Sequence, residues 1–89
     1  MQKAIWKFTL TVPMRCPVLM PEDAQILTVG VQGSSIRMWA LVDPKAVQNT
    51  RYFNVYGTGH PHPGTGDYIG TAFIDELVFH VFEEKEPRS

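Results

Sequence analysis

Hydrophobic and polar residues alternate along most of this chain with a period of two, which is typical of β-strands and not of helices. The clearest case is residues 3–12, KAIWKFTLTV, whose apolar face consists of Ala4, Trp6, Phe8, Leu10 and Val12. Aromatic and β-branched side chains, which strands favour, fill these positions. The same alternation over 24–32 and 35–42, on either side of a Gly33-Ser34 turn, predicts a β-hairpin.

The second half of the chain predicts three further strands, at 51–57, 68–74 and 77–83. The proline-rich segment 13–23 excludes a helix and leaves room for a short extended segment at 17–20. Because no ten-residue stretch has a 3.6-residue period, the class is all-β. Six or seven short strands predict a small antiparallel β-sandwich or barrel.

Several local details are also expected from the residue types. Residues 43–50, DPKAVQNT, could form one exposed helical turn, with Pro44 at its first position after Asp43. Gly30 and Gly70 lie inside predicted strands, where glycine marks a bulge or a close approach of the backbone.

Length and composition describe one domain over residues 1–89, ending in a charged tail at 84–89 that we expect to fray. The net charge of -1 argues against nucleic acid as a partner.

The single cysteine, Cys16, excludes an intramolecular disulfide and fits a reducing compartment. The sequence has no signal-peptide pattern and no apolar run of membrane-spanning length, so we expect a cytoplasmic protein without a membrane partner. Apolar residues on both faces of 35–42 and 77–83 predict a homo-oligomer.

The unusual chemistry is concentrated between Arg51 and Thr71, RYFNVYGTGHPHPGTGDYIGT. The glycine-rich part superficially resembles a phosphate-binding loop, but it lacks the lysine and the following helix that such loops require. It does offer unhindered backbone N–H groups, hydroxyls and imidazoles that suit a polar small ligand. The predicted ligand-binding residues are Arg51, Tyr56, Thr58, His60, His62 and Tyr68.

Catalytic alternatives are weaker. His60 and His62 could face one metal ion, with Asp67 or His80 as a further ligand, but no defined third ligand accompanies them. Cys16 has no nucleophile signature around it, and a half-buried structural cysteine is the better interpretation. We therefore predict a protein that is not an enzyme and holds no metal or cofactor.

Six segments that run in order along the chain resemble a family of small proteins of uncharacterised function from tailed bacteriophages and prophages: IWKFTLTV, LMPEDAQILTVGVQ, MWALVDP, YGTGHPHP, DYIGT and LVFHVFE. The resemblance implies no enzyme activity. It implies an accessory binding protein, for example an anti-defence protein, that blocks a host protein or sequesters a nucleotide-like host signal in the cytoplasm of the bacterial host. Two alternatives stay open: a structural or assembly component of the virion, and a metal-dependent enzyme that uses the His-Pro-His loop.

Overall fold

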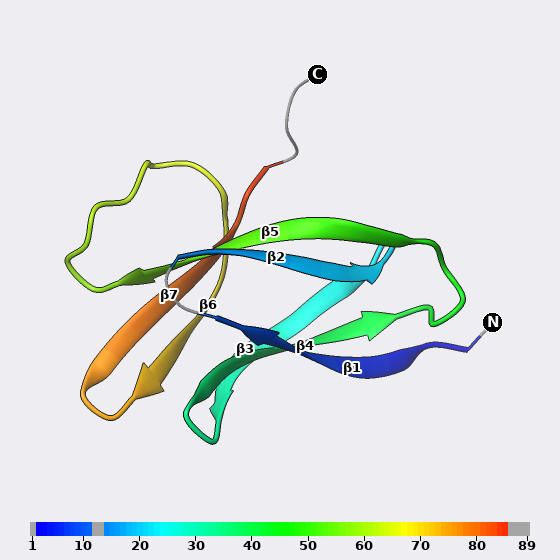
Figure 1. Cartoon of the computed structure of the whole chain (residues 1–89), viewed down its shortest axis with the longest axis horizontal. Coiled ribbons are helices and arrows are strands. Elements are labelled where there is room, and N and C mark those ends of the chain that lie inside the picture. Colours follow the sequence, from blue (N-terminus) through cyan, green and yellow to red (C-terminus); the bar gives the residue numbers. More distant parts are fainter. Residues whose placement is uncertain (1, 12–13, 86–89) are drawn as a thin grey trace.

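A computed structural model describes residues 2–11 and 14–85, and this part of the chain forms seven β-strands and no helix (Figure 1). The strands are β1 (Ala4–Leu10), β2 (Met14–Pro21), β3 (Gln25–Gln32), β4 (Ser35–Val42), β5 (Gln48–Gly57), β6 (Asp67–Ile74) and β7 (Leu77–Glu83). The all-β prediction is therefore confirmed. The described residues contain no helix with the length and apolar character that crossing a membrane requires.

The strands form two antiparallel sheets, one of three strands in the order β1-β4-β3 and one of four in the order β2-β5-β7-β6. The two sheets pack as a small β-sandwich. They approach closely where β3 passes β6, because Gly70 has no side chain there. A Cβ atom at Gly70 would lie 3.0 Å from the Cβ atom of Val29.

The core lies between the two sheets and follows from the period-two pattern. Alternate residues of β4 are buried, and Phe53 of β5 and Val81 of β7 are completely inaccessible to solvent. The buried apolar residues are Leu10, Cys16, Val18, Met20, Ala24, Ile36, Met38, Ala40, Val42, Phe53, Val55, Ala72 and Val81. Burial of this apolar surface supplies the main favourable contribution to folding.

The predicted turn at Gly33-Ser34 is present, and a second tight turn joins β6 to β7. Gln32 pairs with Ser35, and Gly33 takes the left-handed conformation (φ 66°) that closes this hairpin without strain. In the β6–β7 hairpin, Asp75 has a φ of 53°, which an aspartate tolerates better than most residues. The proline-rich segment forms a complete strand, β2, and not only the short piece expected at 17–20. Its position at a sheet edge explains this, since a proline there removes no required hydrogen bond.

Other local predictions need correction. The expected helical turn after Asp43 is a tight turn, in which the Asp43 side chain accepts a hydrogen bond from the backbone N–H of Lys45 at 3.0 Å. β5 then starts at Gln48, three residues earlier than predicted.

Of the two bulges predicted at glycines inside strands, the one near Gly70 is confirmed and the one at Gly30 is not. The register shift in β3 lies between Ile26 and Thr28, and not at Gly30, where a Cβ atom would instead meet the Trp39 ring at 3.3 Å. The shift expected near Gly70 is confirmed, between Tyr68 and Gly70. The predicted last residue of the first strand's apolar face, Val12, lies outside the described residues.

The first two residues of the charged tail contact the four-stranded sheet. Glu84 donates its backbone N–H to the carbonyl of Tyr52 at 2.9 Å, and Lys85 forms an ion pair with Asp67 at 3.1 Å. These two positions were expected to belong to a frayed tail. Residues 86–89, the rest of that predicted tail, lie outside the described residues.

Candidate binding site on the outer face of the four-stranded sheet

Four rings gather on the outer face of the β2-β5-β7-β6 sheet, around Phe82. Tyr68 of β6 is the cross-strand partner of Phe82, and their ring centroids are 5.5 Å apart. Tyr56 of β5 approaches Phe82 edge-on at 5.9 Å. His62 comes from the loop between β5 and β6 and lies 4.4 Å from Phe82 and 4.6 Å from Tyr56. We call Tyr56, His62, Tyr68 and Phe82 the aromatic cluster.

A chain of hydrogen bonds through His80 lies beside the aromatic cluster on the same face. The His80 Nε2 atom lies 2.8 Å from the Thr58 hydroxyl, and its Nδ1 atom lies 3.1 Å from the Thr71 hydroxyl. Thr71 in turn lies 2.6 Å from the hydroxyl of Tyr68. The bulge between Tyr68 and Gly70 makes this possible, because it turns two residues three positions apart toward the same face. These hydrogen bonds connect Tyr68 of the aromatic cluster to Thr71 of β6 and His80 of β7.

The loop between β5 and β6, residues 58–66, projects from the end of β5 and curves back to β6 (Figure 1). The His62 Nδ1 atom accepts a hydrogen bond from the backbone N–H of Gly64 at 2.8 Å. In the neutral ring the proton is therefore on Nε2. Gly64 and Gly66 have φ values of 85° and 96°, which favour glycine. Gly66 also brings the loop back onto β7, since a Cβ atom there would lie 3.0 Å from the Glu83 carbonyl oxygen.

A hollow of about 330 Å³ lies between this loop and the sheet. It is lined by Asn54, Tyr56, Pro63, Thr65, Gly66, Phe82, Glu83, Glu84 and Lys85. Three of these residues are charged, and each belongs to an ion pair. The pairs are Glu83–Arg51 at 2.6 Å, Glu84–Arg15 at 2.7 Å and Lys85–Asp67 at 3.1 Å. The hollow thus combines aromatic walls with a nearly balanced charge.

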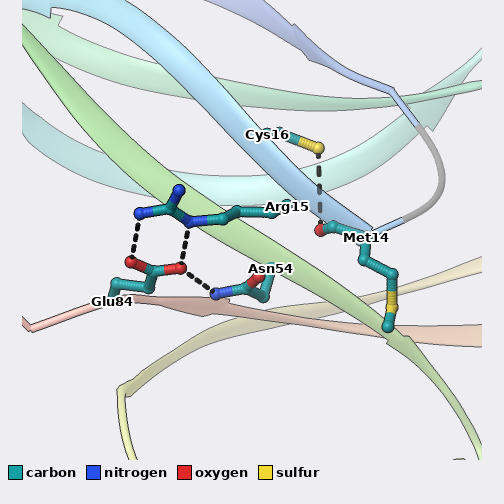
Figure 2. Close-up of polar contacts among 5 residues, drawn as sticks. All are labelled: Met14, Arg15, Cys16, Asn54 and Glu84. Carbon is teal, nitrogen blue, oxygen red and sulfur yellow. Dashed lines mark hydrogen bonds and ion pairs between the residues drawn. The ribbon is translucent and has the colours of Figure 1, made fainter.

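Glu84 and Arg15 form a two-pronged ion pair at the rim of the hollow (Figure 2). The Arg15 Nε and Nη2 atoms donate to the two carboxylate oxygens at 2.7 and 3.0 Å, and the Asn54 amide donates at 2.9 Å. The hydrogen bond from Arg15, followed by that from Asn54, lowers the pKa of Glu84 below its ordinary value. The hydrogen bond to Glu84 raises the pKa of Arg15. The Arg15 guanidinium also lies over the Tyr52 ring, 4.0 Å from its centroid.

Cys16 takes no part in this surface. Its side chain is 2% exposed, and its thiol donates to the Thr11 carbonyl oxygen at 2.6 Å. The thiol also lies 3.9 Å from the Met14 carbonyl oxygen (Figure 2). Because neighbouring residues of a strand point to opposite faces, Cys16 faces the core while Arg15 faces outward. The thiol is therefore a buried group of the core.

Arg51 lies apart from the other predicted ligand-binding residues. Its guanidinium donates to both carboxylate oxygens of Glu83, at 2.6 and 2.8 Å, and to the carbonyl of Ala24 at 2.6 Å. The side chains of Arg51 and Glu83 are only 25% and 18% exposed. Since Ala24 belongs to the turn that leads into β3, this contact joins the two sheets. We call Arg51, Glu83 and the Ala24 carbonyl the sheet clamp.

The structure brings together three of the six predicted residues, Tyr56, His62 and Tyr68, and connects a fourth, Thr58, through His80. His60 packs against Gly57 instead, where a Cβ atom would lie 2.9 Å from its Nδ1 atom. Among residues 2–11 and 14–85, no group of three or more His, Cys, Asp or Glu side chains is placed to hold a metal ion.

Sequence reasoning missed three residues that build the site: Phe82, Asn54 and Glu84. The period-two pattern indicates which residues of each strand share a face, and Phe82 follows that pattern. Its position between Asn54 and Tyr68 depends on the strand order β5-β7-β6, which the pattern does not contain.

The fold and this face define a small all-β sandwich domain with an aromatic hollow on one sheet. The chain belongs to a family of domains of unknown function, DUF7352, whose sequence profile matches residues 1–89. Neither curated proteins nor solved structures include a match to the chain.

Proposed function

We propose that this protein is a non-enzymatic binding protein that holds a planar, nucleotide-like ligand in the hollow beside the aromatic cluster. The observation that supports this most directly is the position of Tyr56 and Phe82, which line an open hollow of about 330 Å³. Aromatic rings bind planar heterocycles by stacking, a contribution of roughly 1–3 kcal/mol per base. The volume of the hollow lies within the range of small-ligand sites, and its lining adds several polar residues to the two rings.

The charges of the hollow indicate which part of such a ligand it takes. Because Glu83, Glu84 and Lys85 each have an oppositely charged partner, the lining offers a phosphate group no concentrated positive field. A neutral base is compatible with these walls. The Asn54 amide and the backbone of Thr65 and Gly66 provide polar groups for its edge. We therefore propose that the base enters the hollow and that any phosphate remains in solvent.

The resemblance to phage accessory proteins suggests a biological setting for this proposal. A protein of that kind would sequester a nucleotide-like signal in the cytoplasm of the bacterial host and would need no cofactor. A second candidate is the blocking of a host protein through the same face. The exposed side chains of Tyr68 (60%) and Phe73 (67%) favour it, since exposed aromatics are common energetic centres of protein interfaces.

The proposal is tested by thermal denaturation with a panel of cyclic nucleotides, nucleosides and free ribose. Ligands that bind the folded state stabilise it by mass action and so raise the melting temperature. At a ligand concentration of one hundred times Kd, the gain in free energy of unfolding is about 2.7 kcal/mol. We expect cyclic nucleotides and their nucleosides to raise it similarly, because the base makes the contact, and ribose to have no effect.

The matched variants are Tyr56→Leu, which removes a ring from the hollow, and Phe73→Leu, which removes an exposed ring of β6 outside it. Tyr56→Leu should weaken binding by about tenfold, the equivalent of one lost stacking contact. Phe73→Leu should leave it unchanged. If no base-containing compound shifts the melting temperature of the unmodified protein, the proposal that the protein binds a nucleotide-like ligand is wrong. If Phe73→Leu weakens binding as much as Tyr56→Leu does, the hollow is not the site.

A further inference from the structure

The outer edge of β1 is a strand edge without a partner in the described residues. β1 lies at the end of the β1-β4-β3 sheet and pairs only with β4, over seven residues from Ala4 to Leu10. An edge of this kind presents a row of unpaired N–H and C=O groups, which is a template for pairing with another strand. Natural proteins usually protect such edges with prolines, bulges, covering segments or projecting charges.

The other edges of the sandwich carry such protection. β2 contains Pro17 and Pro21, which cannot donate to a further strand. β3 and β6 each contain a register shift, and they lie side by side where Gly70 contacts Val29. β1, with the sequence AIWKFTL, has no proline, no glycine and no register shift. Among the four edge strands, it is the one that is open to pairing.

The side chains of β1 also leave the edge accessible. Its single charged residue, Lys7, does not project past the edge. Its Nζ atom donates to the Gln32 side chain at 2.6 Å, across β4 on the outer face of the sheet. Ile5, on that same face, is 61% exposed. A strand that paired with this edge would cover both the Ile5 side chain and the unpaired backbone groups of β1.

We propose that a second copy of this chain pairs with β1 through its own β1, antiparallel, with the two-fold axis at Trp6. The two three-stranded sheets would then form one continuous six-stranded sheet, three strands from each copy. A two-fold axis requires a self-complementary strand, and the side-chain pattern selects the register. With the axis at Trp6, Ile5 lies opposite Lys7 of the partner subunit and can pack on its methylene stem. With the axis at Lys7, two like charges would lie opposite each other, which is unfavourable. This gives an interface to the homo-oligomer that the sequence predicts.

The test is the mass of the protein in solution, measured by sedimentation equilibrium or light scattering over a range of micromolar concentrations. We expect twice the 10.1 kDa of the single chain. Ile5→Lys should weaken the dimer by about tenfold or more, because it places like charges opposite each other at two symmetric contacts. Leu19→Lys is the matched control, since Leu19 is 60% exposed on β2, an edge strand of the four-stranded sheet, and this variant should stay dimeric.

The register has its own test. Adding Lys7→Glu to Ile5→Lys places opposite charges across the axis at Trp6, so the double variant should recover the dimer. An axis at Lys7 would give no such recovery, because the two glutamates would then face each other.

Amide hydrogen exchange on the unmodified protein provides a measurement that needs no variant. The β1 amides that point away from β4 should be protected in a paired edge. A monomeric protein, an oligomer that Ile5→Lys leaves intact, or rapid exchange of those amides would each overturn the proposal.

Discussion

Replacing Arg51 with methionine should destabilise the protein because it removes the guanidinium of the sheet clamp while keeping most of the side chain's apolar length. The variant loses the ion pair with Glu83 and the hydrogen bond to the Ala24 carbonyl. Removing one partner of a fully buried ion pair costs about 3–5 kcal/mol, whereas exposed pairs contribute about 0–1 kcal/mol. These two side chains are 25% and 18% exposed, so we place the loss in free energy of unfolding at about 2 kcal/mol. For a domain of this size, that corresponds to a melting temperature lower by roughly 8–16 °C.

The assay is urea denaturation at fixed pH and salt, followed by circular dichroism, with the midpoint and slope fitted separately. Arg15→Met is the matched control, since it makes the same chemical change in the exposed Arg15–Glu84 pair, where the arginine side chain is 58% exposed. Its midpoint should change much less. The folded Arg51→Met variant should also retain ligand binding, because Arg51 does not line the hollow. Equal effects of the two substitutions on stability, or loss of binding in a folded Arg51→Met variant, would refute the structural role.

Three further predictions concern the core, the contact between the sheets and the Glu84 carboxylate. Phe53→Ala removes a completely buried ring and should cost about 3–5 kcal/mol, which urea denaturation would register as partial unfolding already in buffer. Gly70→Ala should cost about 1–3 kcal/mol, because the added methyl group would lie 3.0 Å from the Cβ atom of Val29, and thermal melts should show the lower stability. The lowered pKa of Glu84 stabilises the folded state at pH values above the group's ordinary 4.5, and this contribution is lost as the pH falls through the folded-state pKa. Stability measured across the acid range should therefore fall less steeply in Glu84→Gln than in the unmodified protein.

Much of the fold could be predicted because strand formation in this chain depends on local patterns. The alternation over residues 3–12 and 35–42 predicts two strands, whose inward faces the structure confirms over 4–10 and 35–42, and Gly33 fixes the hairpin between β3 and β4. The prediction failed where tertiary position overrides local preference. Pro17 is acceptable in a full strand only because β2 lies at a sheet edge, and the bulge near Ile26 has no glycine to mark it.

The candidate site was predictable only in part, for the same reason. Tyr56, His62 and Tyr68 were recognisable because they flank or belong to a glycine-rich loop between strands. Phe82 was not predicted as a site residue, since only the order of the strands reveals that it lies between Asn54 and Tyr68 on the outer face. Arg51 was predicted as a ligand contact without its ion pair, because its partner Glu83 is 32 residues away in sequence and no local pattern links the two.

The central claim, that the hollow beside the aromatic cluster binds a planar base, is tested most directly by a nuclear magnetic resonance titration of the isotopically labelled protein with a nucleoside. We predict saturable chemical-shift changes in the ring signals of Tyr56 and Phe82 and in the backbone amide of Gly66, with Phe73 unchanged. Absence of any saturable change, or changes confined to residues outside the hollow, would contradict the claim.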